Sequence, residues 1–453
     1  MSRLPVLIPD DLKTAARIFS EASKQCWLVG GAVRDGFLGR KSEDYDLATD
    51  AEPEDVMKLF RKTIPTGIKH GTVTILLGTH QFETTTFRRD GEYSDSRRPD
   101  EVAYSKDIHE DLARRDFTIN AIAWDLINNR LMDPHNGRED LKNCIIRAIG
   151  VPSDRLEEDG LRSIRACRFA SQLGFRIDPD TMDAINSTQA NIPAISIERI
   201  WEEMKKIFSS PKPSTAFQLF EETGLLKILI PELQVCVGVG QKGRHVLDVF
   251  NHSLMACDKA SEGNLPVRVA AILHDIAKPL VKETDVDGDV IFHRHDMVGA
   301  EITESIMNRF KAPNAVRDRI VRLVRHHMFH YSSDWTDAAI RRFIARVGLD
   351  LLDDLMALRL ADASAIAPDL PDATAHLREL ISRIDGVLES EATLSIGDLE
   401  VNGKDLMNQL GLKPGPALGT MLNYLLDCVL EDPDTNDHER LLDLGRRWLE
   451  IYG

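Results

Sequence analysis

Residues 28–50 read LVGGAVRDGFLGRKSEDYDLATD, and this stretch decides the fold of the N-terminal part of the chain. An apolar run that ends at Gly30 and Gly31 predicts a strand followed by a tight turn and a short helix. A second strand is expected to open at Asp44. Because side chains alternate across a strand, Asp44 and Asp46 point to the same side, where two carboxylates can hold divalent cations such as Mg²⁺.

The periodicity of the rest of the chain predicts an α+β protein that becomes almost entirely helical after its N-terminal third. Strands with alternating character occur only in the first part, whereas Pro and Gly punctuate long helical patterns from Leu141 onward. We therefore expect a small mixed sheet with helices, followed by helical segments. The predicted strands are 27–30, 71–77 and 81–87, and the predicted helices are 10–25, 32–38, 154–173, 196–208, 214–226, 298–310, 314–327, 336–346 and 349–363.

The two glycines and the helix after them could bind phosphate. Gly30 and Gly31 let backbone N–H groups approach a phosphate closely, and the helix N-terminus adds partial positive charge. Arg34 could add a bidentate contact. With metal ions on Asp44 and Asp46, these groups would hold a nucleoside triphosphate for an in-line displacement. Either motif alone is more often an ordinary turn or surface pair, so the prediction of phosphoryl or nucleotidyl transfer depends on their occurring together.

Composition limits the classes of protein that need to be considered. The chain has 453 residues and a formal net charge of -17, and residues 351–453 hold 20 acidic and 8 basic side chains. Basic surfaces can therefore form upstream, and a nucleic-acid partner is not excluded. No run approaches the roughly 20 apolar residues that span a bilayer, and MSRLPVLIPDD lacks a secretion signal. The six cysteines form no C-x-x-C pair, so we expect reduced thiols and a cytoplasmic location without membrane association.

A series of motifs covers residues 28–208 in order. The strand-turn-strand stretch is followed by EDLARRDFTINAIAWD (110–125), DPHNGREDLKNCIIRAIG (133–150), RLEEDGLRSIRACRFASQLGF (155–175) and ISIERIWEEMKKIF (195–208). The series resembles motifs A to E of the class II tRNA nucleotidyltransferases, which are the CCA-adding enzymes with their CC-adding, A-adding and bacterial poly(A) polymerase relatives.

This resemblance implies a head like that of DNA polymerase β, in which Asp44 and Asp46 are the catalytic residues and bind Mg²⁺. It also implies CTP, ATP and the 3′ end of tRNA, with its acceptor stem and elbow, as partners. Glu83 is the candidate for a third metal-binding carboxylate, with a structural role as the alternative.

Asp159 and Arg162 could select the base. They lie three apart in a helical pattern, which places them on one helix face. Cytosine and adenine each present an amino donor beside an unprotonated ring nitrogen, whereas uracil and guanine present a carbonyl beside a ring N–H. A carboxylate beside a guanidinium complements only the first arrangement. CTP and ATP would therefore be admitted without a nucleic-acid template.

Other residues of these motifs are expected at the nucleotide or at the joints between segments. Arg165 and Arg168 continue the stripe of Arg162 toward the triphosphate or the RNA end, a solvated basic helix face being the alternative. The resemblance places four residues at the ribose, with Arg115 on the nucleotide: Arg114, Arg115, Asp116 and Asn120. It implies that residues 87–102 form a flexible loop. It also implies a hinge or structural role for Asp133, Gly137, Asp140, Leu141, Glu198, Arg199 and Glu203.

The helical half carries a series of histidines and aspartates. Imidazoles and carboxylates within apolar helices are costly without a partner, and a divalent transition metal is one such partner. The series resembles the HD phosphohydrolase superfamily, which implies metal-generated hydroxide and hydrolysis of a phosphate ester. A lone buried histidine is usually structural, and a vestigial, metal-free site is the alternative. The expected ligands are His252, His274, Asp275 and Asp362, with His295 and His326 or His327 for a second metal.

The predicted domains are a nucleotidyltransferase head (1–137), a nucleotide-recognition neck (138–210), a helical connector (211–244), an HD-type domain (245–367) and a helical tail that contacts tRNA (368–453). The favoured function is addition of CMP, AMP or both to tRNA. The rivals are a poly(A) polymerase, and an HD phosphohydrolase whose head only binds RNA. The sequence gives no prediction of the oligomeric state.

Overall fold

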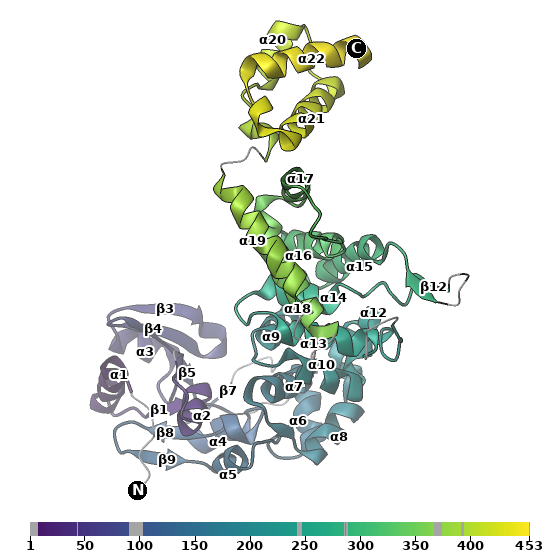
Figure 1. The fold of residues 1–453 in the computed structure, drawn as a ribbon. Helices are drawn as coiled ribbons and strands as arrows, with labels where there is room; N and C mark the ends of the chain where they lie inside the picture. Colours follow the sequence, from purple (N-terminus) through teal and green to yellow (C-terminus); the bar gives the residue numbers. More distant parts are fainter. Residues whose placement is uncertain are drawn as a thin grey trace. The chain divides into compact units, whose positions relative to one another are not determined.

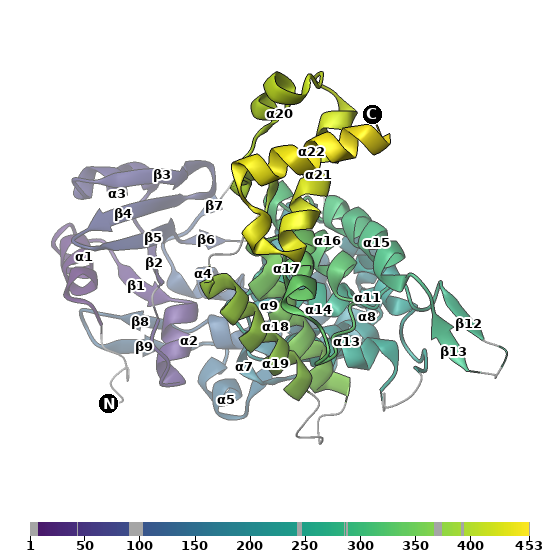
Figure 2. The ribbon, with the colours of Figure 1, turned by 45° about the horizontal axis from the view of Figure 1, so that its top comes forward.

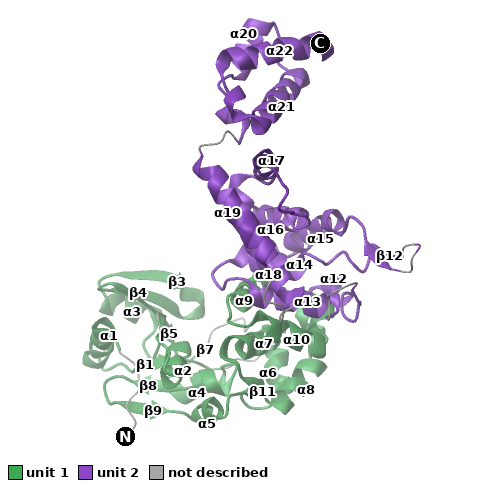
Figure 3. Cartoon of the chain, in the orientation of Figure 1, with its two compact units in different colours: residues 1–229 green, residues 230–453 purple. Residues whose placement is uncertain are grey.

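The structure is a computed structural model that describes residues 8–42, 44–89, 103–241, 247–284, 286, 289–366, 374–390 and 394–452. The chain folds as two compact units, Met1–Leu229 and Ile230–Gly453, which Figure 3 shows in different colours. The division falls inside the predicted connector, and the finer domain boundaries stay predictions. Of the predicted flexible loop, residues 90–102 lie outside the described residues.

Unit 1 begins with a seven-stranded mixed sheet (Figure 1), which confirms the predicted head. The strand order is β3-β4-β5-β2-β1-β8-β9, with β2 and β5 parallel and the other neighbours antiparallel. All four residues of β1 are buried, which accounts for its unbroken apolar sequence. The strands are β1 (Cys26–Val29), β2 (Tyr45–Thr49), β3 (Thr63–Gly67), β4 (Thr72–Leu77), β5 (His80–Thr86), β8 (Ala123–Asp125) and β9 (Arg130–Met132).

Helices pack on this sheet around a buried apolar cluster. The cluster joins Trp27 and Val29 of β1 to Phe87 and to Leu112 of a helix that follows the sheet hairpins. Asp107 caps that helix, because its side chain accepts the backbone N–H of His109. The helices are α1 (Asp10–Glu21), α2 (Gly31–Phe37), α3 (Pro53–Leu59) and α4 (Ile108–Ala113), with the short elements η1 (Ile68–His70), β6 (Arg88–Arg89), β7 (Ala103–Tyr104) and η2 (Thr118–Asn120).

The second part of unit 1 is helical, as predicted, but two of its predicted helices are divided. The pattern over 154–173 breaks at Asp159, whose backbone is extended and whose side chain accepts the N–H of Leu161. The pattern over 214–226 breaks at Gly224, which has a φ of +77°. The elements are α5 (Gly137–Lys142), β10 (Ile145–Ile146), α6 (Pro152–Glu158), α7 (Leu161–Leu173), β11 (Arg176–Ile177), α8 (Pro179–Ser187), η3 (Gln189–Ala194), α9 (Ile197–Phe208), α10 (Pro213–Glu222) and α11 (Leu225–Leu229).

The described residues of unit 2 are helical apart from one short hairpin, which Figure 2 shows beside the helices. Helix α13 packs on α14 and α18, α14 also contacts α16, and α20, α21 and α22 share a separate apolar core. The elements are α12 (Pro231–Gln234), α13 (Val249–Lys259), α14 (Leu265–Leu273), β12 (Lys282–Thr284), β13 (Val290–Phe292), α15 (His295–Arg309), α16 (Asn314–His326), α17 (Asp337–Val347), α18 (Leu349–Ile366), α19 (Ala375–Glu389), η4 (Ile396–Asp398), α20 (Gly403–Leu410), α21 (Pro416–Glu431), η5 (Pro433–Thr435) and α22 (His438–Tyr452).

None of the helices in the described ranges combines the length and the hydropathy that crossing a bilayer requires.

Gly137 marks a very close approach between α5 and η2. A Cβ atom added there would lie 2.1 Å from the carbonyl oxygen of Thr118, far inside van der Waals contact. The neighbouring Asp140 strengthens the same junction, since its carboxylate accepts the hydroxyl of Thr118 at 2.7 Å. The glycine is therefore required by space and not by backbone conformation.

We expect Gly137→Ala to destabilise the junction by about 1–3 kcal/mol, because the added methyl group must push α5 away from η2. Hydrogen exchange of the amides of these two elements measures the effect. Gly386→Ala, within α19, is the control, since open space surrounds its Cβ position. Unchanged protection in the Gly137 variant would contradict the packing described here.

Candidate functional site

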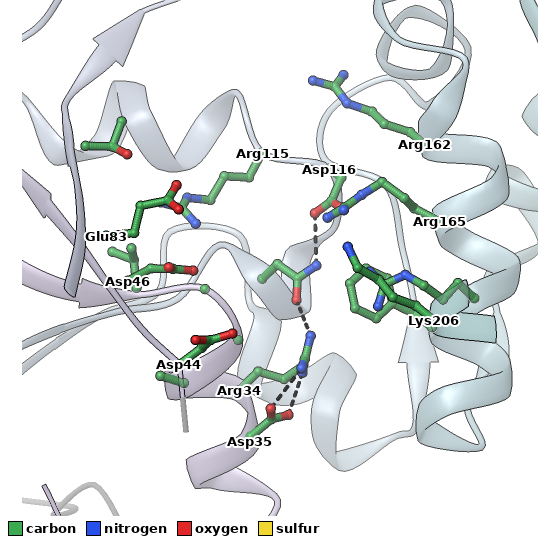
Figure 4. A pocket seen from close by; sticks show the side chains of 18 of the residues that line it. Arg34, Asp35, Asp44, Asp46, Glu83, Arg115, Asp116, Arg162, Arg165 and Lys206 are labelled. Carbon is green, nitrogen blue, oxygen red and sulfur yellow. Dashed lines mark hydrogen bonds and ion pairs between the residues drawn. The ribbon is translucent and has the colours of Figure 1, made fainter. Parts of the chain in front are cut away.

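Three carboxylates gather on one wall of a pocket in unit 1 (Figure 4). Asp46 lies in β2, Asp44 precedes that strand, and the parallel register places Asp46 opposite Glu83 of β5. All three line a pocket of about 740 Å³. The two predicted aspartates and the suggested third carboxylate are thus brought together by the pairing of β2 with β5.

The electrostatics of this wall suit a cation. Burial, together with the charge of Glu83, raises the pKa of Asp46 to about 6, while Arg115 acts in the opposite direction and Asp44 adds a further increase. A divalent cation would relieve the repulsion because it interacts with several carboxylate oxygens at once. The donor atoms are all oxygen, which fits Mg²⁺ better than a softer metal.

The turn before α2 brings the backbone close to the carboxylates. Gly30 has a φ of +68°, a conformation that glycine adopts readily. A Cβ atom at this position would lie 3.3 Å from Nη1 of Arg115 and 3.5 Å from Oδ2 of Asp46. Gly30 and Gly31 line the pocket, so the predicted glycine pair stands next to the acidic wall.

A chain of hydrogen bonds crosses the pocket from α2 to α7. Arg34 Nη1 donates to Asn120 Oδ1 at 2.9 Å, and Asn120 Nδ2 donates to Asp116 Oδ1 at 3.0 Å. The guanidinium of Arg165 then donates to Asp116 Oδ2 at 2.5 and 2.8 Å (Figure 4). Four predicted nucleotide-binding residues therefore form one continuous network that links the sheet region to the helices after it.

Glu203 of α9 extends this network. It is only 3% exposed, and its carboxylate lies 2.5 Å from Nε of Arg168 and 3.5 Å from Nη1 of Arg165. Arg168 also stacks on the ring of Phe169. The resemblance gave Glu203 a structural role, and the observed contacts hold the two arginines of α7 toward the pocket.

Asp159 and Arg162 line the same pocket, although not from one continuous helix. Asp159 lies between α6 and α7, so the prediction that both residues share a helix face is wrong. The side chain of Asp159 accepts the N–H of Leu161, and its other oxygen accepts Arg199 Nη2 at 2.7 Å. The hydrogen bond from the N–H of Leu161 to the side chain of Asp159 interrupts the predicted helix, yet the side chains of Asp159 and Arg162 both line the pocket.

The guanidinium of Arg162 is held by three acceptors. Its Nη1 donates to the carbonyl of Arg155 at 2.6 Å and to Glu158 at 2.7 Å, and its Nη2 donates to the carbonyl of Arg114 at 3.2 Å. These bonds leave the Nε–H and one Nη2–H of Arg162 for a ligand. The orientation of the group is therefore fixed before any ligand arrives.

Several pocket residues were missed by the sequence reasoning as binding groups. Arg88 follows β5, Arg199 and Lys206 come from α9, and all three line the pocket. The resemblance places Arg88 in the flexible loop and Arg199 among the residues with a hinge or structural role. Their positive charge was the available signal, but their spacing did not show which face of the fold they would occupy.

A second group of predicted residues meets in unit 2. His252 Nε2 lies 3.0 Å from Asp362 Oδ1, and His274 Nε2 lies 3.2 Å from Asp275 Oδ2 and 3.6 Å from Asp362 Oδ1. All four side chains are buried. Burial lowers the pKa of His274, but Asp275 and Asp362 together raise it to about 10. The two carboxylates thus favour a positive charge at the centre of the cluster.

Asp275 also joins a second group with His295 and His327. Its Oδ1 atom lies 3.3 Å from His295 Nε2 and 3.9 Å from His327 Nε2. The structure therefore brings His327 into the group, whereas His326 is half-buried and belongs to neither candidate metal-binding group of the described residues. Burial, followed by the charge of His274, lowers the pKa of His327 to about 3.

The ring orientation of three of these histidines is suited to metal binding. Nδ1 of His274, His295 and His327 lies 2.9, 2.8 and 2.6 Å from a backbone carbonyl three residues earlier. Their Nε2 atoms are buried and have no hydrogen-bond partner within the described ranges. A carbonyl on Nδ1–H leaves the Nε2 lone pair toward the cluster, which is the arrangement that metal-binding histidines adopt.

Comparisons with known proteins identify the domains and the family of the chain. Three family models match: the poly A polymerase head domain over residues 26–147, the probable RNA and SrmB-binding site of polymerase A over 174–236, and the HD domain over 243–366. The CCA-adding enzyme of Enterococcus faecalis is 32% identical over 97% of both chains. The chain belongs to this family of tRNA nucleotidyltransferases.

Other members of the family differ in their named products. The A-adding tRNA nucleotidyltransferase of Deinococcus radiodurans is 34% identical over 93% of this chain and 95% of its own. The crystal structure of the CCA-adding enzyme of Bacillus stearothermophilus in complex with CTP is 28% identical, with a TM-score of 0.75 over 98% of this chain and all of that one. The predicted family and fold class are confirmed.

In this tRNA nucleotidyltransferase the ion pair of Asp116 is expected to contribute to stability. Burial acts to raise the pKa of Asp116, but Arg165, Asn120 and the N–H of Phe117 lower it to about 2. Because this value lies below the ordinary 3.8, the contribution is present above pH 4 and is lost as the pH falls toward 2. The shift corresponds to roughly 2 kcal/mol.

We expect Asp116→Asn to lower the free energy of unfolding at neutral pH by roughly 2 kcal/mol or more, since Arg165 also loses its partner. Urea unfolding followed by circular dichroism at several pH values measures the difference, which should shrink below pH 4. Asp180→Asn, at an exposed position of α8, is the control. An equal loss at every pH would contradict the assignment.

Proposed function

We propose that this tRNA nucleotidyltransferase transfers CMP, AMP or both from CTP and ATP to the 3′-hydroxyl of tRNA and releases pyrophosphate. The observation that carries the proposal is one pocket in which the carboxylates Asp44, Asp46 and Glu83 form one wall (Figure 4) and which Asp159 and Arg162 also line. Full-length relatives named as CCA-adding and A-adding enzymes support it.

Base selection follows from the groups that Asp159 and Arg162 leave free. Each carboxylate oxygen of Asp159 accepts one hydrogen bond from the protein and keeps a second lone pair. Arg162 keeps two N–H donors. An acceptor beside a donor matches the amino group and ring nitrogen of cytosine or adenine. UTP and GTP would place a carbonyl against the carboxylate and are rejected.

The remaining pocket residues position the triphosphate and the attacking hydroxyl. Arg34, Arg165 and Arg168 can neutralise phosphate charge, and the network through Asn120 and Asp116 holds two of these guanidinium groups in place. Mg²⁺ held by the acidic wall would stabilise the charge that develops on the attacking and leaving oxygens. A carboxylate of the same wall accepts the proton of the 3′-hydroxyl.

We also propose a cytoplasmic location and contact between the tail, residues 368–453, and the tRNA. All six cysteines are unpaired thiols, as expected in a reducing compartment.

The first test uses three transcripts of one tRNA, ending before CCA, after C and after CC, with Mg²⁺ and each nucleoside triphosphate singly and together. We expect extension by C, A or both but not by U or G. Two C residues and one A on the shortest transcript show full CCA addition, and extension of only the CC transcript shows A addition. Product length is read at single-nucleotide resolution.

Asp46→Asn is the control for this assay. Removal of one carboxylate from the acidic wall should lower the rate by about a thousandfold or more, in line with losses of transition-state charge stabilisation. An open-ended A tail would favour the poly(A) polymerase. Absence of extension by the folded wild-type chain would overturn the proposal.

A second function is favoured by the buried cluster of unit 2. We infer that the two groups that share Asp275 bind divalent transition-metal ions and support hydrolysis of a phosphate ester. Lys278 Nζ lies 2.6 Å from Asp275 Oδ2, the oxygen that also lies near His274. Arg359 Nη1 lies 2.5 Å from Asp362 Oδ2, whereas the histidines approach Asp362 at Oδ1, so one cation contacts each carboxylate. This activity is independent of the acidic wall in unit 1.

We expect His327→Gln to lower the content of bound metal after dialysis against Mn²⁺, Ni²⁺ or Zn²⁺, because the variant loses an imidazole Nε2 atom that faces the cluster. Mass spectrometry of the metal in the dialysed protein measures it. His326→Gln is the matched control at the next residue and should keep the wild-type content. Equal metal content in both variants and the wild type would remove His327 from the site.

A further inference from the structure

Three arginines gather at a single carboxylate beside the acidic wall, two through their guanidinium groups and one through its backbone N–H. Arg115 Nη2 lies 3.0 Å from Asp111 Oδ2, Arg114 Nη1 lies 3.8 Å from Asp111 Oδ1, and that same oxygen accepts the backbone N–H of Arg88 at 3.3 Å. The side chain of Asp111 is 4% exposed. Two guanidinium groups and one backbone N–H thus share this carboxylate.

The guanidinium group of Arg88 is only partly hydrogen-bonded within the described residues. Its Nη1 donates to the carbonyl of His70 at 3.0 Å, whereas its Nε is buried and has no partner in the described part of the chain. Nε of Arg115 is likewise buried and has no hydrogen-bond partner among the described residues. Burial, together with the charge of Arg114, lowers the pKa of Arg88 to about 10. Buried, unpaired donors among like charges are costly, and an anionic ligand would satisfy them.

The position of the arginine cluster relative to the acidic wall indicates which part of the substrate the cluster would contact. Arg88 is the first residue of β6, two residues after the end of β5, and it lines the pocket together with Glu83 and Thr85 of β5. In Figure 4 the side chain of Arg115 reaches toward Glu83, while Arg34 and Asp44 lie on the other side of Asp46. The excess positive charge is therefore on the Glu83 side of the acidic wall.

An in-line displacement separates the leaving pyrophosphate from the attacking hydroxyl. The two oxygens lie on opposite sides of the reacting phosphorus. If the pyrophosphate lies along Arg34, as the proposed function has it, the RNA strand approaches from the side of Glu83. The last phosphodiester of that strand would then meet the arginine cluster.

We propose that Arg88, with Arg114 and Arg115, forms an acceptor-strand subsite that binds the phosphodiester next to the 3′-terminal nucleotide of the RNA. The proposal rests on the proposed function and deepens it. Arg88 is the residue to test, because Arg114 and Arg115 are also expected at the nucleotide, whereas Arg88 is not. A triphosphate presents the same phosphate chemistry, so the experiment must separate RNA from nucleotide.

The test compares wild type, Arg88→Gln and Arg61→Gln on a transcript that the wild type extends. The RNA carries either a normal phosphodiester or an uncharged methylphosphonate before its last nucleotide. Arg61 is an exposed arginine of unit 1 that does not line the pocket, and serves as the control. KM for the RNA and for the nucleotide is measured with each protein, and RNA binding without nucleotide is measured by fluorescence anisotropy.

We expect the methylphosphonate to raise KM and Kd for the RNA by about tenfold with wild type and Arg61→Gln, the range for one charged hydrogen bond. Arg88→Gln should raise both by about tenfold on the normal RNA and show no further rise on the methylphosphonate. KM for the nucleotide should stay unchanged.

An equal methylphosphonate effect in Arg88→Gln and wild type would overturn the proposal, as would a rise in KM for the nucleotide alone, which would assign Arg88 to the triphosphate. If Arg88→Gln fails to fold by circular dichroism, Arg88→Lys replaces it and should recover part of the phosphate dependence. A wild type that extends no transcript refutes the proposed function, whereas the anisotropy comparison still decides whether Arg88 binds the phosphodiester.

Discussion

The contact between Asp116 and Arg165 is the constraint on which the nucleotide pocket depends. Asp116 belongs to the segment between α4 and η2, and Arg165 to α7. One part of unit 1 supplies the carboxylates and the other supplies Asp159 and Arg162, so the proposed binding of one nucleotide by both parts requires that they keep a fixed separation. The ion pair fixes it, and Asn120 and Glu203 connect the pair to Arg34 and Arg168. A phosphate that reaches these arginines therefore meets groups that are already ordered.

Much of the fold could be predicted because its signals are local. The alternation in 71–77 and 81–87 and the glycine pair at Gly30 and Gly31 depend on neighbouring residues, and the structure has β4, β5 and the turn before α2 at those places. The pairing of β2 with β5 is not local. Glu83 could be suggested only from the resemblance, since the register that sets it opposite Asp46 is formed by strands far apart in the sequence.

Other parts of the site escaped prediction for definite reasons. The repeat over 154–173 hides a break, because the carboxylate of Asp159 satisfies the N–H of Leu161 and competes with the helix. His326 and His327 are adjacent, and nothing in the sequence shows which of them is the better metal-ligand candidate. In the structure only His327 is fully buried, with its Nδ1 at the carbonyl of Val324. Arg88 was ambiguous as well, since positive charge in a loop does not show which way the side chain turns.

The way Arg162 is held has a consequence for how specificity can change during evolution. Three acceptors fix its guanidinium, and Arg199 and the N–H of Leu161 hold the carboxylate of Asp159. A pocket for uracil or guanine would need a donor where Asp159 stands and an acceptor where Arg162 stands. Each single replacement leaves its former hydrogen-bond partners unsatisfied and matches only one of the two groups of the new base. Under the proposed base selection, a single replacement therefore weakens the recognition of C and A without completing that of U or G, so a change of specificity requires both positions to change.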